Sequence, residues 1–184
     1  AAARRAFESV PWVRHAVVKR VWPNRLSVQL EEHRPAALWA ADDGNDKLVN
    51  SFGEVFEANV GDVEDDALPR LAGPEASASR MLGLYRRLNP VLAKLDAGDV
   101  DQLRLSGRGS WRAELEGGAV LELGRGTDDE VVARAERFVR TVSQVTGQYQ
   151  RPLEYADLRH NDGYAVRLKG VTTQLPAAPA ARKR

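Results

Sequence analysis

The sequence contains no cysteine and only three histidines among its 184 residues. Without cysteine, the chain has no disulfide, no thiolate metal site and no cysteine nucleophile. It has no long apolar run, so no segment is predicted to span a bilayer. Lys and Arg number 27 against 26 for Asp and Glu, so no excess of positive charge points to nucleic acid. The remaining composition, 43% hydrophobic, suffices for a buried core in one large domain or two small ones.

The groups that would form a catalytic or metal centre do not come together in the sequence. His15, His33 and His160 are far apart, and none has a second histidine or a carboxylate at metal-ligand spacing on a helix. We interpret them as surface or hydrogen-bonded histidines. The serines have no nucleophile-elbow context. The sequence therefore predicts no catalytic residue, no metal and no cofactor.

One glycine-rich turn, Gly124-Arg125-Gly126-Thr127, precedes a predicted helix and is a candidate anion site. It lacks both the Gly-Lys-Ser/Thr ending of a P-loop and the third glycine of the dinucleotide fingerprint. Thr127 and Glu130 instead match a capping box, so we favour a structural turn with a helix cap. The acidic runs are interpreted as solvated charge: Asp42-Asp43, Glu64 to Asp66 and Asp128-Asp129.

The first 35 residues predict a helix, a strand, a tight turn and a second strand. Residues 1–8 have helical spacing, residues 13–22 are rich in β-forming side chains, and residues 25–32 alternate apolar and polar side chains. Pro23-Asn24 supplies the turn between the strands. The sequence opens inside the helical pattern, so we expect this unit to be a piece of a longer chain.

Residues 36–170 predict a larger domain of the α+β class, with a mixed or antiparallel β-sheet and packed helices. Strands are expected at 36–39, 47–50, 54–56, 100–105, 111–115, 119–123, 153–159 and 164–168. Helices are expected at 79–88, from Pro90 to about Leu95, and from Thr127 to a terminating Gly147.

The final predicted strand, Tyr164 to Leu168, has no ordered element predicted after it. If it lies at the edge of an open sheet, a partner strand would gain main-chain hydrogen bonds there. The pattern equally allows an internal strand, or an edge protected by Arg167 and Lys169. Residues 171–184 are interpreted as a disordered basic tail, either solvated or in contact with a membrane surface.

A series of short motifs runs in order through residues 5–168. The motifs are Val10 to Val13, Val21 to Leu26, Glu31 to Ala36, Leu48 to Asn50 with Gly53 to Phe56, Leu121 to Gly126 with Arg137 to Val139, and Tyr155 to Arg159 with Gly163 and Ala165-Val166. In this order and spacing they resemble the FtsQ family of bacterial cell division proteins. Within that resemblance, the N-terminal part is similar to the end of an FtsQ-type POTRA domain.

The resemblance implies a partial POTRA domain at 1–35, which lacks its first strand and helix, a β domain at 36–170 and a tail at 171–184. It implies a single-pass inner-membrane protein, anchored upstream of this sequence, whose present part lies in the periplasm at the division septum. It also implies an adaptor without catalysis that binds FtsB and FtsL. Other divisome proteins would bind the POTRA part, and no nucleic acid would be bound.

In the family, a segment of FtsB adds a strand to the last β-strand. Carried over to this sequence, the resemblance places the contact at Arg159, His160, Asp162, Gly163, Tyr164, Val166 and Leu168, with Arg108 as a second positive contact. Arg159 would pair with an acidic group of the partner. His160 stands where the family often has tyrosine, and Leu168 where tryptophan can occur.

Two alternative hypotheses remain at this point. One is a different POTRA-containing protein, such as an outer-membrane assembly factor or a secretion pore, but the sequence shows one POTRA-like unit and no repeat. The other is an enzyme that uses the turn from Gly124 to Thr127 as an anion site.

Overall fold

A nine-stranded mixed sheet forms most of the computed structural model, which describes residues 2–41, 44–63, 67–160 and 162–171. The strands are β3 (Pro35–Trp39), β4 (Lys47–Asn50), β5 (Val55–Phe56), β6 (Arg70–Ala72), β7 (Val100–Leu105), β8 (Trp111–Leu115), β9 (Val120–Gly124), β10 (Leu153–Asp157) and β11 (Ala165–Leu168). Their order across the sheet is β11-β10-β9-β8-β7-β6-β3-β4-β5. The acidic pair Asp42-Asp43, the run Glu64 to Asp66 and the predicted tail after Val171 lie outside the described residues.

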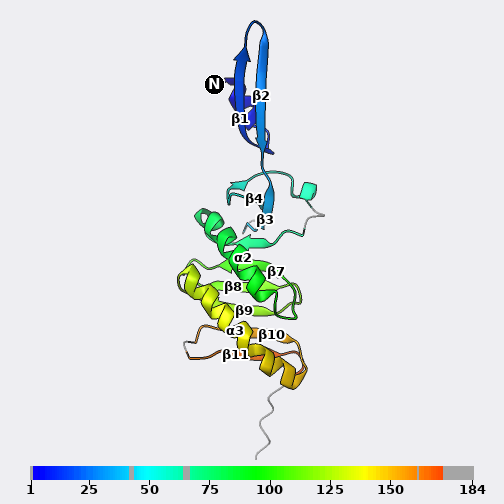
Figure 1. The fold of residues 1–184 in the computed structure, drawn as a ribbon, viewed down its shortest axis with the longest axis vertical. Helices are drawn as coiled ribbons and strands as arrows, with labels where there is room; N and C mark the ends of the chain where they lie inside the picture. The colour runs from blue at the N-terminus through cyan, green and yellow to red at the C-terminus, as the bar shows by residue number, and fades with distance from the viewer. Residues whose placement is uncertain (1, 42–43, 64–66, 161, 172–184) are drawn as a thin grey trace, which may run out of the picture.

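Two helices, α2 (Ala78–Leu92) and α3 (Asp128–Tyr149), pack side by side over one face of this sheet (Figure 1). Each has an apolar stripe at helical spacing, which in α3 consists of Val131, Ala135, Phe138 and Val142. Together with the facing strand residues, these stripes form the main core. Two short 3₁₀ segments, η1 (Val60–Val63) and η2 (Glu75–Ser77), lie in the connections.

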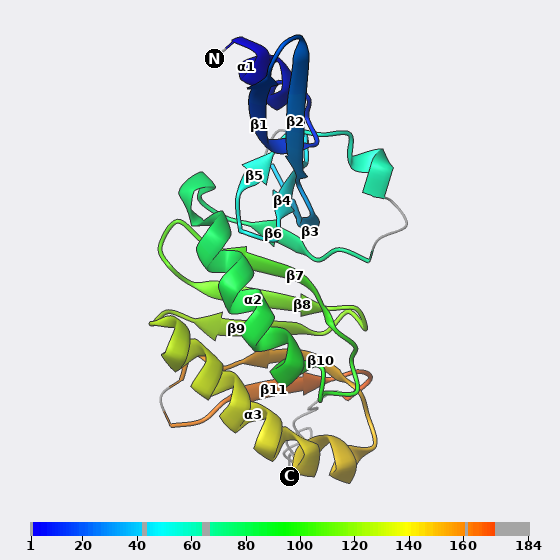
Figure 2. The same ribbon diagram turned by 45° about the horizontal axis from the view of Figure 1, so that its top comes forward.

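The N-terminal residues form a separate two-stranded hairpin that projects away from the large sheet (Figures 1 and 2). Helix α1 (Ala2–Glu8) packs against β1 (Val13–Val21), and β1 pairs antiparallel with β2 (Arg25–Glu32). Every residue of β2 is exposed. The hairpin therefore has little core of its own, as the sequence predicts for so small a unit.

A polar and aromatic joint connects the hairpin to the sheet domain. Arg14 donates hydrogen bonds from Nε and Nη2 to Glu54, at 2.8 and 3.0 Å, and from Nη1 to Glu31 at 2.7 Å. Arg14, followed by the amide of Asn50, lowers the pKa of Glu54 to about 2. The imidazole of His33 stacks on Phe56 with ring centroids 4.1 Å apart, and burial lowers its pKa. His33 is thus a packed, hydrogen-bond-forming histidine.

The predicted α+β class, with a mixed sheet and packed helices, is confirmed. Two predicted helix boundaries are wrong. Helix α2 runs through Pro90 instead of restarting there, because Pro90 lies in the last turn and its missing N–H costs one hydrogen bond near the helix end. Helix α3 passes Gly147 and ends where Gln150 adopts the left-handed conformation (φ 49°). Among the described residues, no helix is both long and apolar enough to cross a bilayer.

The start of α3 is fixed by the predicted capping box, which is confirmed. The backbone N–H of Glu130 donates to the Thr127 hydroxyl at 3.3 Å, and Glu130 Oε2 accepts from the Thr127 N–H at 2.8 Å. We expect Thr127→Ala to lower the free energy of unfolding by about 1 kcal/mol, because a helix N–H loses its acceptor. Urea unfolding followed by tryptophan fluorescence measures this change.

The matched control is Thr146→Ala on the same helix, whose hydroxyl donates within the helix to the Val142 carbonyl at 3.3 Å and caps nothing. Its effect should stay within about 0.5 kcal/mol. Equal effects of the two substitutions would contradict the capping interpretation.

Candidate partner-binding site

Strand β11 is one edge of the large sheet, and it pairs with β10 alone among the described strands. The pairing is antiparallel, with Ala156 opposite Val166 and Asp157 opposite Ala165. The sequence left open an internal position, an open edge and an edge protected by Arg167 and Lys169. The structure has an edge strand, in which Arg167 is exposed, as is Lys169 directly after it. An edge strand presents unpaired backbone groups along its outer side.

The outward-facing backbone groups belong to Val166 and Leu168. Just past the strand, the N–H of Lys169 donates inward to the Pro152 carbonyl at 3.0 Å. Backbone direction alternates from residue to residue in a strand, so Arg167 and Ala165 also direct their N–H groups toward β10. The opposite side of β10 agrees with this assignment. The N–H of Leu158 donates to the Glu122 carbonyl of β9 at 2.9 Å, so the backbone N–H of the preceding residue, Asp157, points toward β11. Val166 therefore offers both its N–H and its C=O to an added strand, whereas Leu168 offers only its N–H, because its carbonyl accepts from the Val171 N–H at 3.2 Å.

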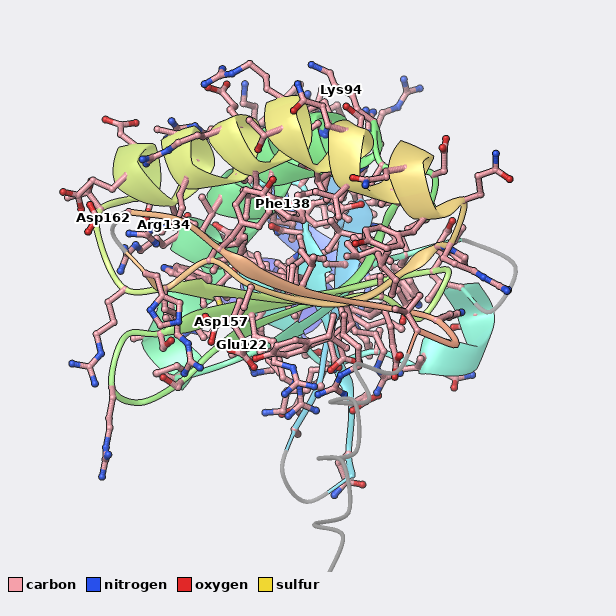
Figure 3. The ribbon with its side chains drawn as sticks, turned by 90° about the horizontal axis from the view of Figure 1, so that it is seen from below. Lys94, Glu122, Arg134, Phe138, Asp157 and Asp162 are labelled. Atoms are coloured by element: carbon pink, nitrogen blue, oxygen red, sulfur yellow. The ribbon has the colours of Figure 1, made fainter. Side chains whose placement is uncertain are left out.

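The side chains at Tyr164, Val166 and Leu168 turn toward α3. Tyr164 meets the edge of Phe138 with centroids 4.8 Å apart and an interplanar angle of 90°. The hydroxyl of Tyr164 donates to Thr141 Oγ1 at 2.8 Å. Phe138 lies between α3 and the sheet (Figure 3). These contacts hold the edge strand in place before any partner arrives, which lowers the entropic cost of adding a strand.

On the opposite face, β11 presents Ala165 and Arg167. The guanidinium of Arg167 lies 5.7 Å from the ring centre of Tyr155 on β10. Both β11 residues are exposed, whereas Leu168 is buried in the main core. A strand added at this edge would thus meet a charged side chain on the open face and an apolar rim on the helix face.

Arg159 follows β10, and its guanidinium group forms a bidentate ion pair with the carboxylate of Asp157. Its Nε and Nη2 donate to the two carboxylate oxygens at 2.9 and 2.6 Å, and its backbone N–H donates to Oδ1 at 3.0 Å. Arg159 therefore lowers the pKa of Asp157 to about 2, and Asp157 raises the pKa of Arg159. The carboxylate side chain is 13% exposed and the guanidinium side chain 54% exposed, so the cation faces solvent while its partner is nearly buried.

The side chain of Arg159 lies against Gly124, the last residue of β9. A Cβ placed on Gly124 would come within 3.0 Å of Arg159 Cγ and 3.4 Å of Arg134 Nη1. Arg134 donates to the carbonyl groups of Leu123 and Arg125 on either side of this glycine. Gly124 has φ +78°, which a residue with a side chain rarely adopts. The glycine thus leaves room for the side chains of Arg159 and Arg134 at one end of the sheet.

The remaining predicted contact residues lie around the same end of the sheet. His160, Asp162 and Gly163 are exposed in the connection between β10 and β11. Arg108 is exposed in the β7–β8 turn, which follows the end of β7. Because β10 is parallel to β9, and β8 is antiparallel to both β7 and β9, this turn and Arg159 share one end of the sheet, with β9 between them.

Sequence reasoning about side chains missed Asp157, Gly124 and Arg134 as parts of this site. A local signal existed for Asp157, since a carboxylate two residues before an arginine at a strand end lies on the same side as that arginine. Gly124 and Arg134 had no such signal, because their contact with Arg159 depends on β9 lying beside β10.

The turn from Gly124 to Thr127 is filled by the chain's own groups. A Cβ on Gly126 would lie 2.6 Å from Glu130 Oε2, and that same oxygen accepts the Thr127 N–H. An external anion would have to displace a carboxylate from the helix N-terminus, where it is already favourably placed.

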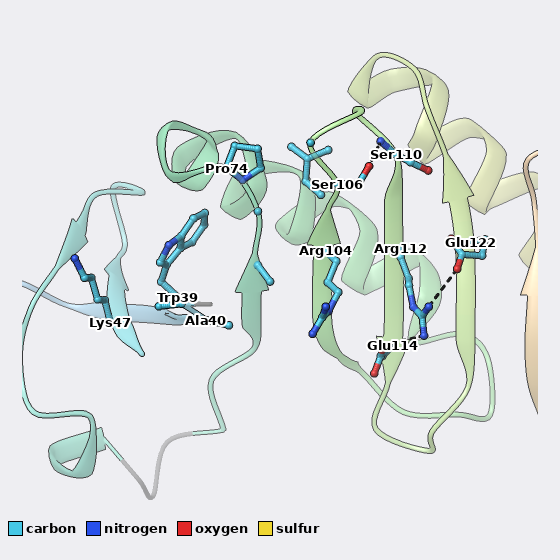
Figure 4. A pocket seen from close by; sticks show the side chains of 15 residues that line it. Trp39, Ala40, Lys47, Pro74, Arg104, Ser106, Ser110, Arg112, Glu114 and Glu122 are labelled. Atoms are coloured by element: carbon cyan, nitrogen blue, oxygen red, sulfur yellow. Dashed lines mark hydrogen bonds and ion pairs between the residues drawn. The ribbon is translucent and has the colours of Figure 1, made fainter. Parts of the chain in front are cut away.

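A hollow of about 1090 Å³ lies on the sheet face opposite the helices (Figure 4). Arg104 and Arg112 line it, with Glu114 and Glu122 beside them. Arg112 pairs with Glu114 at 3.2 Å and with Glu122 at 3.4 Å. These charges largely compensate one another on an open polar surface, which differs from the enclosed apolar pockets that bind small molecules.

Two family models match the chain. Residues 37–159 match the C-terminal domain of the cell division protein FtsQ/DivIB family, and residues 1–33 match the FtsQ-type POTRA domain.

Curated relatives with the name cell division protein FtsQ are similar along most of the chain. The protein from Burkholderia pseudomallei is 42% identical over 92% of this chain and 66% of its own length. Those from Thiomonas arsenitoxydans and Bordetella pertussis are 35% and 39% identical, over 100% and 90% of this chain and 70% and 64% of their own lengths. The chain thus spans about two thirds of the length of these relatives.

The ion pair of Asp157 predicts a specific dependence of stability on pH. Arg159 lowers the folded-state pKa of Asp157 from its usual 3.8 to about 2. The contribution of the pair is therefore complete above about pH 4 and is lost as the pH falls toward 2. We expect Asp157→Asn to lower the free energy of unfolding at pH 7 by on the order of 1 kcal/mol, after allowance for the solvent around Arg159.

This difference between the unsubstituted protein and Asp157→Asn should shrink steadily below pH 4, as measured by urea unfolding at a series of pH values. In an Arg159→Gln background, the pH-dependent effect of Asp157→Asn should be much smaller, because only the backbone N–H of residue 159 still donates to the carboxylate. A dependence that persists undiminished in that background would assign the low pKa of Asp157 to a partner other than the Arg159 guanidinium.

Proposed function

The chain belongs to the FtsQ/DivIB family of cell division proteins, and we propose that it is a non-catalytic adaptor that binds FtsB and FtsL through strand addition at β11. In this proposal the protein works in the periplasm at the division septum, held at the inner membrane by a segment outside this sequence. The hairpin serves as a second surface for other divisome proteins. No chemistry is assigned to the protein; its function is to bring partners together.

The observation that carries the proposal is the open edge at β11. The outward N–H and C=O of Val166 and the outward N–H of Leu168 have no partner among the described strands. Added main-chain hydrogen bonds would supply affinity, and the side chains beside the edge would select the partner. The packing of Tyr164 on Phe138 supports this, because it keeps the edge extended and ordered.

Arg159 adds a charge-selective element next to this edge. Its Nε and Nη2 donate hydrogen bonds to Asp157, whereas Nη1 donates none to a described residue. A carboxylate from an FtsB segment can bind the outer side of the guanidinium while Asp157 holds the inner side. We therefore propose an acidic residue in the partner, adjacent to the segment that pairs with β11.

The alternative hypotheses have less support. The family models cover most of the chain with FtsQ-type domains, which removes the reason to invoke a secretion pore or barrel assembly factor. The anion site that the enzyme hypothesis needs is occupied by Glu130.

Strand addition is tested by removing one outward N–H. Val166→Pro deletes the N–H that would face the partner without removing an inward bond to β10. We expect micromolar or tighter binding of an FtsB periplasmic peptide to the unsubstituted protein, measured by isothermal calorimetry. Binding by Val166→Pro should be weaker by at least about tenfold, because the partner carbonyl is left unpaired.

The matched control is Val166→Ala, which trims the side chain but keeps the N–H, and should bind within a few-fold of the original. Far-UV spectra and melting temperatures establish that both variants fold. Equal binding by folded Val166→Pro, or no binding by the unsubstituted protein, would rule out this mode of FtsB recognition.

A further inference from the structure

The buried amide of Asn50 lies at the centre of the joint, where the base of the hairpin meets β4 and β5 (Figure 2). Asn50 is the last residue of β4 and is 0% exposed. Its Oδ1 accepts hydrogen bonds from the backbone N–H groups of Phe52 and Glu54, both at 2.9 Å. Two N–H donors identify this atom as the oxygen, so the orientation of the amide is fixed. The NH₂ group of Asn50 therefore points away from these two N–H groups.

This NH₂ group determines the protonation state of His33. It donates to Glu54 Oε2 at 2.6 Å, and it lies 3.0 Å from His33 Nδ1. An NH₂ group has no acceptor, so Nδ1 accepts this hydrogen bond and carries no hydrogen of its own. The contact thus requires a neutral imidazole with its hydrogen on Nε2. A protonated imidazole has a hydrogen on both nitrogens, so no rotation of the ring restores the bond.

The charged groups that face His33 come from β1, β2 and the turn between β4 and β5. Glu54 and Glu31 favour the protonated ring, whereas Arg14 disfavours it. Burial is the largest influence, and the pKa of His33 is lowered from its usual 6.5. The ring stacks on Phe56 with an interplanar angle of 4°, so water does not solvate that face of it. The folded joint therefore holds His33 in the neutral form.

The turn between β4 and β5 is fixed to the sheet domain. Gly53 has φ +84° and lies so close to α2 that a Cβ on it would be 2.5 Å from Ser79 Cα. Arg86 of α2 also donates to the carbonyl of Ser51 at 2.9 Å. A change at His33 therefore leaves this turn in place, and its effect falls on the contact between the turn and the hairpin.

We propose that His33 is a pH-sensitive switch that fixes the hairpin to the sheet domain when neutral and releases it when protonated. His33 and Arg34 are the two residues between β2 and β3. Protonation places the Nδ1 hydrogen against the NH₂ group of Asn50 and a positive charge near Arg14, so the ring leaves its position on Phe56. The hairpin can then rotate about the two connecting residues. The inference goes beyond the adaptor function, because it assigns control over the orientation of the hairpin relative to the partner-binding edge.

The pH range of the switch follows from proton linkage. His33 has its usual pKa of 6.5 in the released state and a lower pKa in the fixed state. The released state therefore binds more protons, and it is favoured as the pH falls below 6.5. Between pH 7.5 and pH 5.5 the ratio of released to fixed hairpin rises by at most about tenfold. Glu54, with a pKa of about 2, stays ionised throughout this range.

The absence of cysteine from the sequence allows the orientation of the hairpin to be measured with spin labels. Labels are attached to Ser27→Cys, an exposed position on β2, and Gln144→Cys, an exposed position on α3. We expect double electron–electron resonance to give a narrow distance distribution at pH 7.5 and a broader one at pH 5.5. Imidazole NMR of the unlabelled chain should show His33 with its hydrogen on Nε2 at pH 7.5, and a titration below pH 6.5 that the broadening follows.

Two matched substitutions in the labelled chain assign the effect to one histidine. His33→Asn places an amide oxygen where Nδ1 lies and takes up no proton, so the distribution should not broaden further at pH 5.5. His15→Asn is the control, because the His15 ring contacts Glu8 within the hairpin unit itself, with Nδ1 3.1 Å from the carboxylate. The broadening at pH 5.5 should persist in this variant.

The proposal fails if NMR finds the hydrogen on Nδ1 of His33, or a pKa of His33 at or above 6.5. It also fails if the distance distribution is the same at both pH values, or if His33→Asn broadens on acidification as much as the unsubstituted chain. Should His33→Asn have a broad distribution already at pH 7.5, the unsubstituted chain decides: broadening that does not follow the His33 titration overturns the proposal.

Discussion

Backbone pairing on one side of β11 is the constraint on which the proposed binding site depends. A strand inside a sheet has both rows of backbone groups paired, and a terminal strand leaves one row to water or to a partner. Here the strand has only four residues, and Arg167 lies within it and Lys169 follows it. Short length and positive charge discourage pairing with arbitrary chains. The edge is therefore open to an added strand of suitable length and charge, and unfavourable for a long apolar one.

The local elements were largely readable from the sequence, because alternation and capping are short-range signals. The face shared by Tyr164, Val166 and Leu168 follows from a period of two, and the start of α3 follows from Thr127 and Glu130. The edge position was not readable, since it requires that β10 lie parallel to β9 after the α3 crossover. Strand order is a property of contacts between distant segments, so the pattern of β11 alone allowed both an edge and an internal position.

The same reasoning explains the errors and omissions. Pro90 and Gly147 are local signals for helix ends, but α2 continues past Pro90 to the buried Leu92 of the main core. Helix α3 continues past Gly147 for two residues whose side chains are exposed, and no core contact explains this extension. Conversely, the position of Arg159 is fixed by two groups, of which only Asp157 is near it in sequence. Gly124 looked like part of a turn, and its contact with Arg159 arises from the adjacency of β9 and β10.

The joint around Arg14 determines whether the two ends of the molecule act together. Arg14 reaches Glu31 on the hairpin and Glu54 on the sheet domain, and the buried amide of Asn50 donates to the same Glu54 carboxylate at 2.6 Å. The low pKa of Glu54 keeps it ionised, and this stabilisation is lost only as the pH falls from about 4.5 toward 2. At neutral pH the hairpin is thus fixed to the sheet by charged and aromatic contacts at once.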